Sequence, residues 1–256
     1  MTKLKYPKII IYTILIALAI LTITILFKSY YKVENRTRKI NGCKEFDKVK
    51  PLGWLRVQGT NIDFPIVYYN DLDVTDPKYE LGWNYSEDRK LTKKVTIFSH
   101  NVLNVSSTPL IADKNHKRFE QLLSFIYTDF VKKNKYIQYT VGGKDYLYKI
   151  YGISFQEEET LDYLNTNINK EEEKKYIDKV INDSYFKFDV DVKETDHLIT
   201  LVTCTRFFGN TTKYSFVVDA RMVRKNERIK NYKVTENKSY KKIKKTLEGD
   251  VEDEEI

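Results

Sequence analysis

A chain of 256 residues is long enough for one folded domain with attached segments, or at most for two small domains. Apolar residues make up 41% of it and aromatic residues 14%, which supplies a core and favours β-structure. The net charge of +8 is spread along the chain, so nothing indicates a nucleic-acid binding surface. Two cysteines cannot form a disulfide framework, and no Cys/His spacing predicts a zinc site. We expect neither a metal nor a cofactor.

An uncharged segment of 19 residues runs from Ile9 to Phe27, after Lys3, Lys5 and Lys8. As a helix it would be about 28 Å long, which matches the core of a bilayer. The residues after Phe27 do not fit a signal-peptide cleavage site. The pattern predicts an uncleaved signal anchor, with residues 1–8 in the cytoplasm, 9–27 in the membrane and the rest outside the cell. A buried core helix is the alternative. Basic residues also follow the segment, so charge alone does not fix its orientation.

Residues 28–50 are charged and mixed, which predicts a helical stalk. Cys43 lies in this stalk, away from any strand end or base. We expect it to be packed or incidental rather than catalytic. Pro51 and Gly53 end the segment.

Two short strands are predicted next, over residues 54–57 and 62–68, with a turn between them. Pro65 has no backbone N–H to donate, so it predicts an edge position for the second strand. Residues 70–94 are polar, and we expect them to be irregular.

A strand over residues 95–99 carries His100 and Asn101 at its end. After a loop, apolar residues recur at the spacing of one amphipathic helix, namely Phe119, Leu122, Leu123, Ile126, Phe130 and Val131. Strands over 136–141 and 145–155 are then joined by Gly142-Gly143, a hairpin signal. A second helix is predicted from Asn169, a suitable cap, to Asn182.

The residues from Leu198 to Arg206 alternate as a strand, and Cys204 lies near the end of it. A loop and a last strand over 215–223 follow. The segment 225–256 is first strongly basic and then acidic, and we expect this tail to be disordered or loosely helical.

A thiol at the end of a strand is accessible and rigidly held, although a lone cysteine is also a common core residue. His197 is about 23 Å away along the same strand and cannot reach it. His116 lies in a polar loop, where we expect a local hydrogen-bonding role. His100 ends another strand, so it can be either a structural histidine or the base that meets Cys204. Such an imidazole would take the thiol proton and later protonate a leaving amine.

At these residues the sequence resembles the sortases, the membrane-anchored cysteine transpeptidases of Gram-positive bacteria. Thr200–Cys204 matches the TLxTC signature of that family, and Ser99-His100-Asn101 matches its histidine motif with serine for glycine. Gly59–Val67 resembles an early stretch of the family. The helix at 169–182 and the segment 30–50 are similar to features of class B members.

This resemblance implies a mostly β fold, a closed eight-stranded barrel with peripheral helices, over a catalytic domain at 51–224. It implies that a surface-protein sorting peptide is cut through a thioacyl-enzyme at Cys204, with His100 as acid and base. The acyl group would pass to an amine of a peptidoglycan precursor or of a pilin. The partners are therefore these peptides and amines, at the outer face of the cell membrane.

One residue departs from the family pattern. Sortases carry a catalytic arginine at the start of the strand after the cysteine, and here Tyr214 or Ser215 occupies that position. Arg221 lies roughly 20 Å too far along the strand. Arg206 is the first candidate for the substitute cation and Lys213 the second; a solvated loop charge is the alternative for both. A hydrolase, or a degenerate sortase that binds peptide with little turnover, stays open beside the transpeptidase.

Overall fold

A computed structural model describes residues 6–27, 30–43, 49–158 and 169–249. The chain divides into two compact units. The first comprises the residues up to Lys32 together with Arg228–Asn231, and the second comprises Val33–Glu227 and the residues from Tyr232 onwards.

The first unit contains helix α1 (Tyr6–Phe27), which includes the segment that the sequence predicts to span a membrane. Across the part of the chain that the structure describes, no helix has the length and apolarity needed to cross a membrane. The structure therefore gives no support to the transmembrane part of the fold prediction.

Most of the described residues in the predicted stalk over residues 28–50 are not helical. Helix α2 (Thr37–Gly42) is short, and residues 30–36 before it are not helical. Residues 44–48 lie outside the described part of the chain. An ion pair holds this segment in place, since the buried Arg36 guanidinium lies 2.7 Å from a carboxylate oxygen of Asp63. Cys43 packs against a small apolar cluster that includes Val74.

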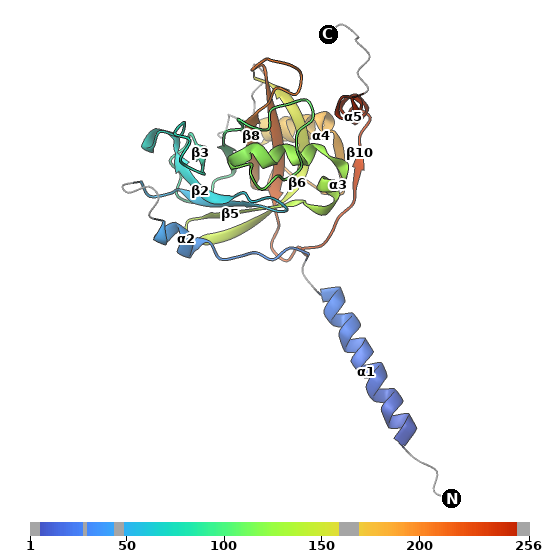
Figure 1. Ribbon diagram of the computed structural model, residues 1–256. Helices are drawn as coiled ribbons and strands as arrows, with labels where there is room; N and C mark the ends of the chain where they lie inside the picture. The colour runs from blue at the N-terminus through green and yellow to red at the C-terminus, as the bar shows by residue number, and fades with distance from the viewer. Residues whose placement is uncertain (1–5, 28–29, 44–48, 159–168, 250–256) are drawn as a thin grey trace, which may run out of the picture. The chain divides into compact units, whose positions relative to one another are not determined.

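The second unit is built on a closed eight-stranded barrel, which confirms the predicted fold class (Figure 1). Its strands follow the order β1-β2-β3-β4-β8-β9-β6-β5. They are β1 (Gly53–Val57), β2 (Asp63–Tyr68), β3 (Gly82–Asn84), β4 (Lys94–Phe98), β5 (Tyr136–Val141), β6 (Lys144–Glu157), β8 (Leu198–Cys204) and β9 (Tyr214–Met222).

The hairpin between β5 and β6 turns at Gly142 and Gly143, as predicted, and both have positive φ, which glycine adopts without strain. The edge position predicted for Pro65 is wrong, because β2 pairs with β1 on one side and β3 on the other. The proline is tolerated since the β3 ladder begins one residue later, at Ile66. β3 itself, with the short helix η1 (Tyr69–Asp71), lies in the stretch that was expected to be irregular.

The neighbouring strands β4 and β8 are parallel, with Lys94 opposite Leu198 and Phe98 opposite Val202. Neighbouring parallel strands run towards the same side of a sheet. His100 and Cys204 each lie two residues beyond the Phe98–Val202 pair. The register of this one pair therefore delivers both residues to the same rim of the barrel.

The predicted amphipathic helix is divided in two. A 3₁₀ helix, η2 (Arg118–Ile126), is followed by α3 (Thr128–Lys133), and the extended backbone of Tyr127 separates them. Nearly every residue of η2 is buried, including Glu120 and Gln121, so its surroundings rather than one apolar stripe set its conformation.

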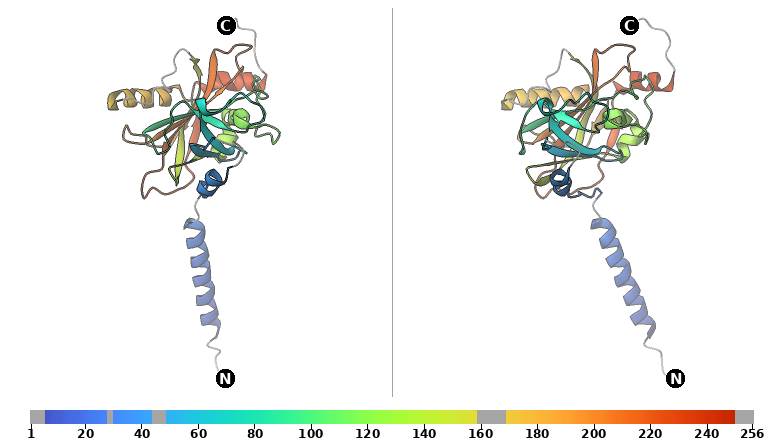
Figure 2. Two further views of the ribbon diagram at one scale, coloured as in Figure 1. Left: turned by 90° about the vertical axis from the view of Figure 1, so that its left-hand side faces the viewer. Right: turned by 60° about the vertical axis from the view of Figure 1, so that its left-hand side comes forward.

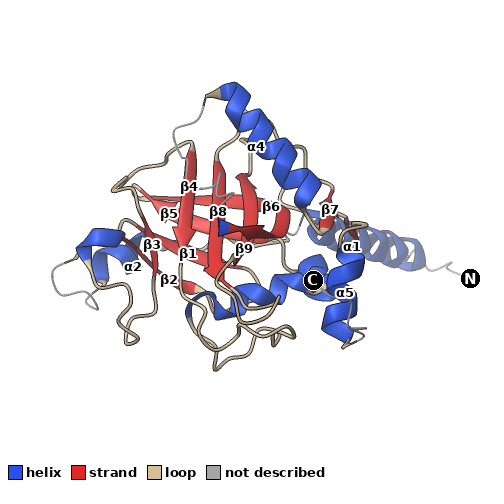
Figure 3. Cartoon of the chain, turned by 90° about the horizontal axis from the view of Figure 1, so that it is seen from above, coloured by secondary structure: helices blue, strands red, loops and turns tan. Residues whose placement is uncertain are grey.

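Helix α4 (Lys170–Asp183) begins at Asn169 as predicted, where side chains of Asn169 and Glu172 form a reciprocal cap. It covers the outside of the barrel, and a view from above shows it crossing beside β6 (Figures 2 and 3). Its Tyr176 hydroxyl donates to Asp219 of β9 at 2.6 Å and lies 3.0 Å from the Thr200 hydroxyl of β8. Burial raises the pKa of the Asp219 carboxyl. This buried contact fixes α4 against the strand that carries Cys204.

The charged tail is more ordered than predicted. β10 (Val234–Glu236) pairs with β7 (Phe186–Phe188), and α5 (Tyr240–Glu248) follows. Tyr240 and Ile243 are buried, and the Tyr240 ring lies 4.8 Å from that of Phe186. Two apolar residues at helical spacing thus anchor a segment whose overall composition is basic.

Candidate active site

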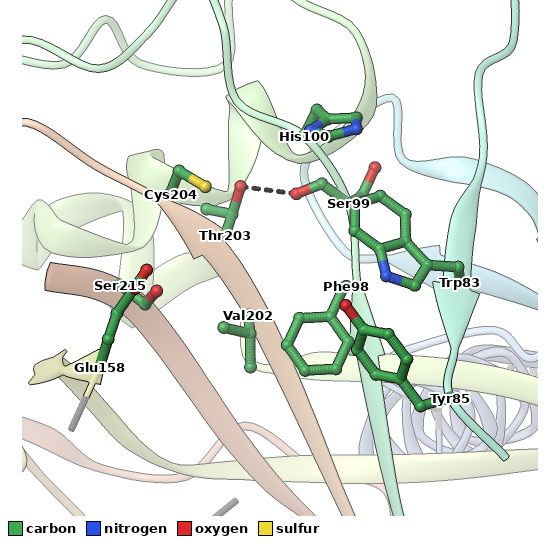
Figure 4. A pocket seen from close by; sticks show the side chains of 10 residues that line it. All are labelled: Trp83, Tyr85, Phe98, Ser99, His100, Glu158, Val202, Thr203, Cys204 and Ser215. Carbon is green, nitrogen blue, oxygen red and sulfur yellow. Dashed lines mark hydrogen bonds between the residues drawn. The ribbon is translucent and has the colours of Figure 1, made fainter. Parts of the chain in front are cut away.

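A cavity of about 520 Å³ opens on the outer face of β4, β8 and β9, at the rim where His100 and Cys204 emerge. Its lining is chemically divided (Figure 4). In that view one side is aromatic and is formed by Trp83, Tyr85 and Phe98. The other side is polar and is formed by Cys204, Ser215 and Glu158, and His100 lies above both.

Cys204 is the last residue of β8 and carries a free, exposed thiol. Its carbonyl accepts a hydrogen bond from Asn101 Nδ2 at 3.0 Å, which ties the cysteine to the residue after His100. Although Cys204 reaches solvent, burial by the surrounding protein raises the pKa of its thiol. The charge of Glu158 raises this pKa further, whereas the cysteine's own backbone and Arg206 lower it.

His100 packs against the indole of Trp83, with ring centroids 4.8 Å apart. Burial lowers the pKa of its imidazole, and the charge of Arg118 lowers it further, while a hydrogen bond to the Val74 backbone acts the other way. Nε2 is buried and has no hydrogen-bond partner among the described residues. A neutral imidazole held through one nitrogen leaves the other free to accept a proton.

The loop that carries His100 is held by buried polar groups that the sequence did not single out. The Glu120 carboxylate accepts the backbone N–H groups of Val102 and Leu103 at 3.2 and 3.1 Å. Asn104 donates to the Glu120 carbonyl at 2.7 Å and accepts from its own loop at Leu110. Glu120 stands among the apolar residues of the predicted helix, and this position could have indicated a buried structural carboxylate. Its partners could not be predicted, because the tertiary fold determines them.

The other two histidines are away from the cavity, as expected. His197 lies before the first residue of β8, at the far end from Cys204, and its Nδ1 is 2.8 Å from the Thr92 carbonyl. The backbone carbonyl of His116 accepts hydrogen bonds from Asn61 and Gln121, while its buried Nδ1 has no hydrogen-bond partner among the described residues.

Of the two residues expected at the position of the family arginine, Ser215 lies directly opposite Cys204 in the β8–β9 pairing. Arg221 is opposite Leu198 at the other end, where it is buried and paired with Glu227. The structure therefore confirms that Arg221 cannot reach the thiol.

The two candidate cations do not line the cavity. Arg206 is exposed just beyond β8, and its charge still acts on the Cys204 thiol. Lys213 is 3.7 Å from a carboxylate oxygen of Glu157, which also accepts a hydrogen bond from the Tyr214 hydroxyl. Lys213 and Tyr214 are thus engaged with Glu157.

The arrangement suits nucleophilic chemistry between neutral partners. With the thiol pKa raised and the imidazole pKa lowered, both groups are uncharged at neutral pH. Proton transfer to His100 would then accompany attack by the sulfur, rather than precede it. Within the residues described, no cluster of His, Cys, Asp or Glu has the composition of a metal site.

The family model, the similar sequences and the similar structures are all those of sortases. The model of the Sortase domain family matches residues 55–223. The chain is 25% identical to the sortase B of Listeria monocytogenes over 202 residues, which is 69% of this chain and 74% of that protein. The structure of Clostridium perfringens sortase B covers 72% of this chain and 99% of its own, with a TM-score of 0.57 and 23% identity. The Staphylococcus aureus sortase B–substrate complex gives a TM-score of 0.57 at 19% identity, over 75% of this chain and 86% of that one.

The pKa directions predict how Cys204 reacts with pH. Because burial raises the pKa of the folded thiol above its ordinary value, the thiol is protonated at neutral pH. The rate of alkylation by iodoacetamide, measured on the full chain with Cys43→Ser, should keep rising up to and beyond pH 9. His100→Ala should change this profile little. A plateau reached below pH 7, lost in His100→Ala, would instead indicate a preformed thiolate–imidazolium pair.

Proposed function

The chain belongs to the sortase family, and from this premise we propose that it is a class B-like cysteine transpeptidase. It cleaves a C-terminal sorting signal of surface proteins and transfers the acyl group to an amine of a cell-wall precursor or of a pilin. The observation that carries the proposal is that Cys204 and His100, from two parallel strands, line one cavity.

In the first half-reaction the Cys204 sulfur attacks the carbonyl carbon of the scissile peptide bond. The thiol proton passes to Nε2 of His100 as the carbon–sulfur bond forms. The tetrahedral intermediate then collapses, the carbon–nitrogen bond breaks, and His100 returns the proton to the leaving amine. A thioester on Cys204 and a neutral imidazole are left.

In the second half-reaction an amine attacks the thioester carbonyl. His100 accepts a proton from this nitrogen, and the sulfur leaves and regains the proton as the thiol. The new amide bond is released and both residues return to their starting states. Water in place of the amine would give hydrolysis by the same steps.

Both tetrahedral intermediates carry an oxyanion that needs a donor or a positive charge. We assign this role first to Arg206, because it lies two residues beyond the cysteine and its charge acts on the thiol. Lys213 is second, since reaching the oxyanion would mean leaving Glu157. Backbone N–H groups at the end of β8 are the remaining source.

A sorting peptide is the proposed acyl donor, by analogy with the Staphylococcus aureus sortase B that was solved with its substrate. The aromatic wall of Trp83, Tyr85 and Phe98 offers apolar contact to such a peptide beside the thiol.

A second candidate function is a hydrolytic or degenerate sortase-like protein that binds sorting peptides with little transpeptidation. Two observations favour this candidate. The residue opposite Cys204 is Ser215, not a basic residue, and the pKa of the thiol is raised rather than lowered. Either feature would slow acylation.

We further propose that the protein is anchored in the cell membrane by residues 9–27, with its catalytic domain outside the cell. Support comes from the sequence, in which the segment is uncharged and follows Lys3, Lys5 and Lys8. Within α1 the exposed apolar side chains occur all round the helix, at Ile10, Ile11, Tyr12, Ile14, Leu15, Ile16, Leu18, Ile20 and Leu21.

The transpeptidase predicts a covalent intermediate. Mass spectrometry of the full chain mixed with a library of sorting peptides should show an acyl adduct on Cys204. A nucleophilic amine should discharge it to an amide product. His100→Ala should retain the thiol but lower adduct formation by 10²-fold or more, and Cys204→Ala should abolish it. If both variants cleave peptides at the wild-type rate, the proposal fails. If the acyl group is transferred only to water even when an amine is added, the protein is a hydrolase.

The assignment of the oxyanion cation predicts different effects for two basic residues. Arg206→Ala should lower the rate of peptide cleavage on the order of 10²-fold, the typical cost of one oxyanion donor. Lys213→Ala, which removes another exposed charge that is already paired with Glu157, should change the rate less than threefold. The reverse ranking would give the role to Lys213, and no effect of either would leave it to backbone N–H groups.

Membrane anchoring predicts the behaviour of the full chain in cells. It should stay in the membrane pellet after alkaline carbonate extraction, and a membrane-impermeant thiol reagent should label Cys204 on intact cells. Leu15→Lys combined with Leu18→Lys should release it, because each central lysine costs about 2.5–3.5 kcal/mol on insertion. Recovery of the unmodified chain in the carbonate supernatant would contradict the anchor.

A further inference from the structure

Glu158 lies next to the reactive thiol, although no motif in the sequence points to it. It directly follows β6 and lines the cavity with Cys204 and Ser215 (Figure 4). Gln156, Ser215 and Cys204 form one cross-strand row over β6, β9 and β8. Since side chains alternate along a strand, Glu158 continues the face that this row shares, and Glu157 belongs to the other face.

The charge of Glu158 is unbalanced in this cavity. Among the described residues that line it, Glu158 is the one carboxylate, and none is a lysine or an arginine. No lysine or arginine in the described ranges forms an ion pair with it. The neighbouring Glu157, in contrast, forms an ion pair with Lys213 and accepts a hydrogen bond from the Tyr214 hydroxyl.

A carboxylate in this position has two effects on the site. Because the opposite side of the cavity is aromatic, the field of this carboxylate is less screened there than in open water, so it concentrates cations in the cavity. It also opposes formation of the Cys204 thiolate, and a bound cation would relieve that repulsion. A cationic substrate group would therefore be attracted to the thiol and would assist its reaction.

We infer that Glu158 binds a cationic group, an ammonium or a guanidinium, which a substrate brings beside the Cys204 sulfur. Two substrates could supply it: a basic side chain of the acyl-donor peptide, or the acceptor amine, which arrives as an ammonium ion at neutral pH and loses one proton to water before it attacks the thioester. Only the identity of this substrate rests on the proposed transpeptidase function, because the preference for a cation belongs to the cavity itself.

Charged thiol reagents test the preference without any peptide. On the full chain with Cys43→Ser, the rates of Cys204 modification are compared for cationic trimethylammonioethyl, anionic sulfonatoethyl and neutral methyl methanethiosulfonate. Each rate is divided by that of the same reagent with mercaptoethanol. Glu158→Gln should lower the cation-to-anion ratio about fivefold or more. The neutral reagent reports the change in thiol acidity, and it should react faster with this variant.

Glu157→Gln is the matched control, because it removes the same charge one residue away, on the other face. Its cation-to-anion ratio should stay within twofold of the parent. A ratio that Glu158→Gln leaves unchanged, or that both variants lower equally, would overturn the inference, since the cavity would then respond to net charge alone.

Two further measurements on Glu158→Gln identify the source of the cation. If the acceptor supplies it, KM for triglycine should rise while that for hydroxylamine, which is neutral at pH 7, should not. If the donor peptide supplies it, acylation by lysine-containing peptides should fall relative to their glutamine counterparts. If an enzyme that forms the acyl adduct shows neither of these effects, the result contradicts a role of Glu158 in substrate binding. Absence of any adduct would reject the proposed function and leave the reagent result standing.

Discussion

The parallel pairing of β4 with β8 is the contact on which the site depends. The register from Lys94–Leu198 to Phe98–Val202 places the two strand ends side by side, and the residues that follow are a histidine and a cysteine. A shift by one residue would turn the Cys204 side chain to the opposite face of the sheet. The loops beyond the strands reinforce this register, because Asn101 bonds to the Cys204 carbonyl and Thr203 donates to the Ser99 carbonyl at 2.8 Å.

Charge is distributed unevenly around the thiol. A serine faces the cysteine where a cation was expected, the available cations lie outside the cavity, and a carboxylate lies inside it. These features act together to keep the resting thiol protonated. The reactivity of the thiol then depends on the charge of the bound substrate, and a positively charged substrate group would be electrostatically complementary to this cavity.

The local parts of this fold could be predicted from the sequence because short-range chemistry determines them. The Gly142-Gly143 turn, the Asn169 cap and the strand before Cys204 all follow from neighbouring residues. β3 and β10 could not be predicted, since each is a strand of three residues that exists through pairing with a distant partner.

The same distinction applies to the site. Cys204 and His100 could be proposed from strand ends and from the family motifs, and counting from the cysteine put Tyr214 or Ser215 in the arginine position. Glu158 and the aromatic wall could not be found in this way, because they reach the cavity through the curvature of the barrel. The direction of the Arg206 side chain depends on a loop that no local pattern specifies.

The Tyr176 hydroxyl, which lies between Asp219 and Thr200, has a consequence for cooperativity. Helix α4 cannot detach from an otherwise intact barrel without depriving a buried carboxyl group and a buried hydroxyl of this partner, and such groups are costly to leave buried and unpaired. Opening of the helix and loosening of β8 and β9 are therefore parts of one event. In amide exchange α4 and the strand bearing the thiol should behave as a single foldon, although the helix lies on the surface and contributes nothing to the lining of the cavity.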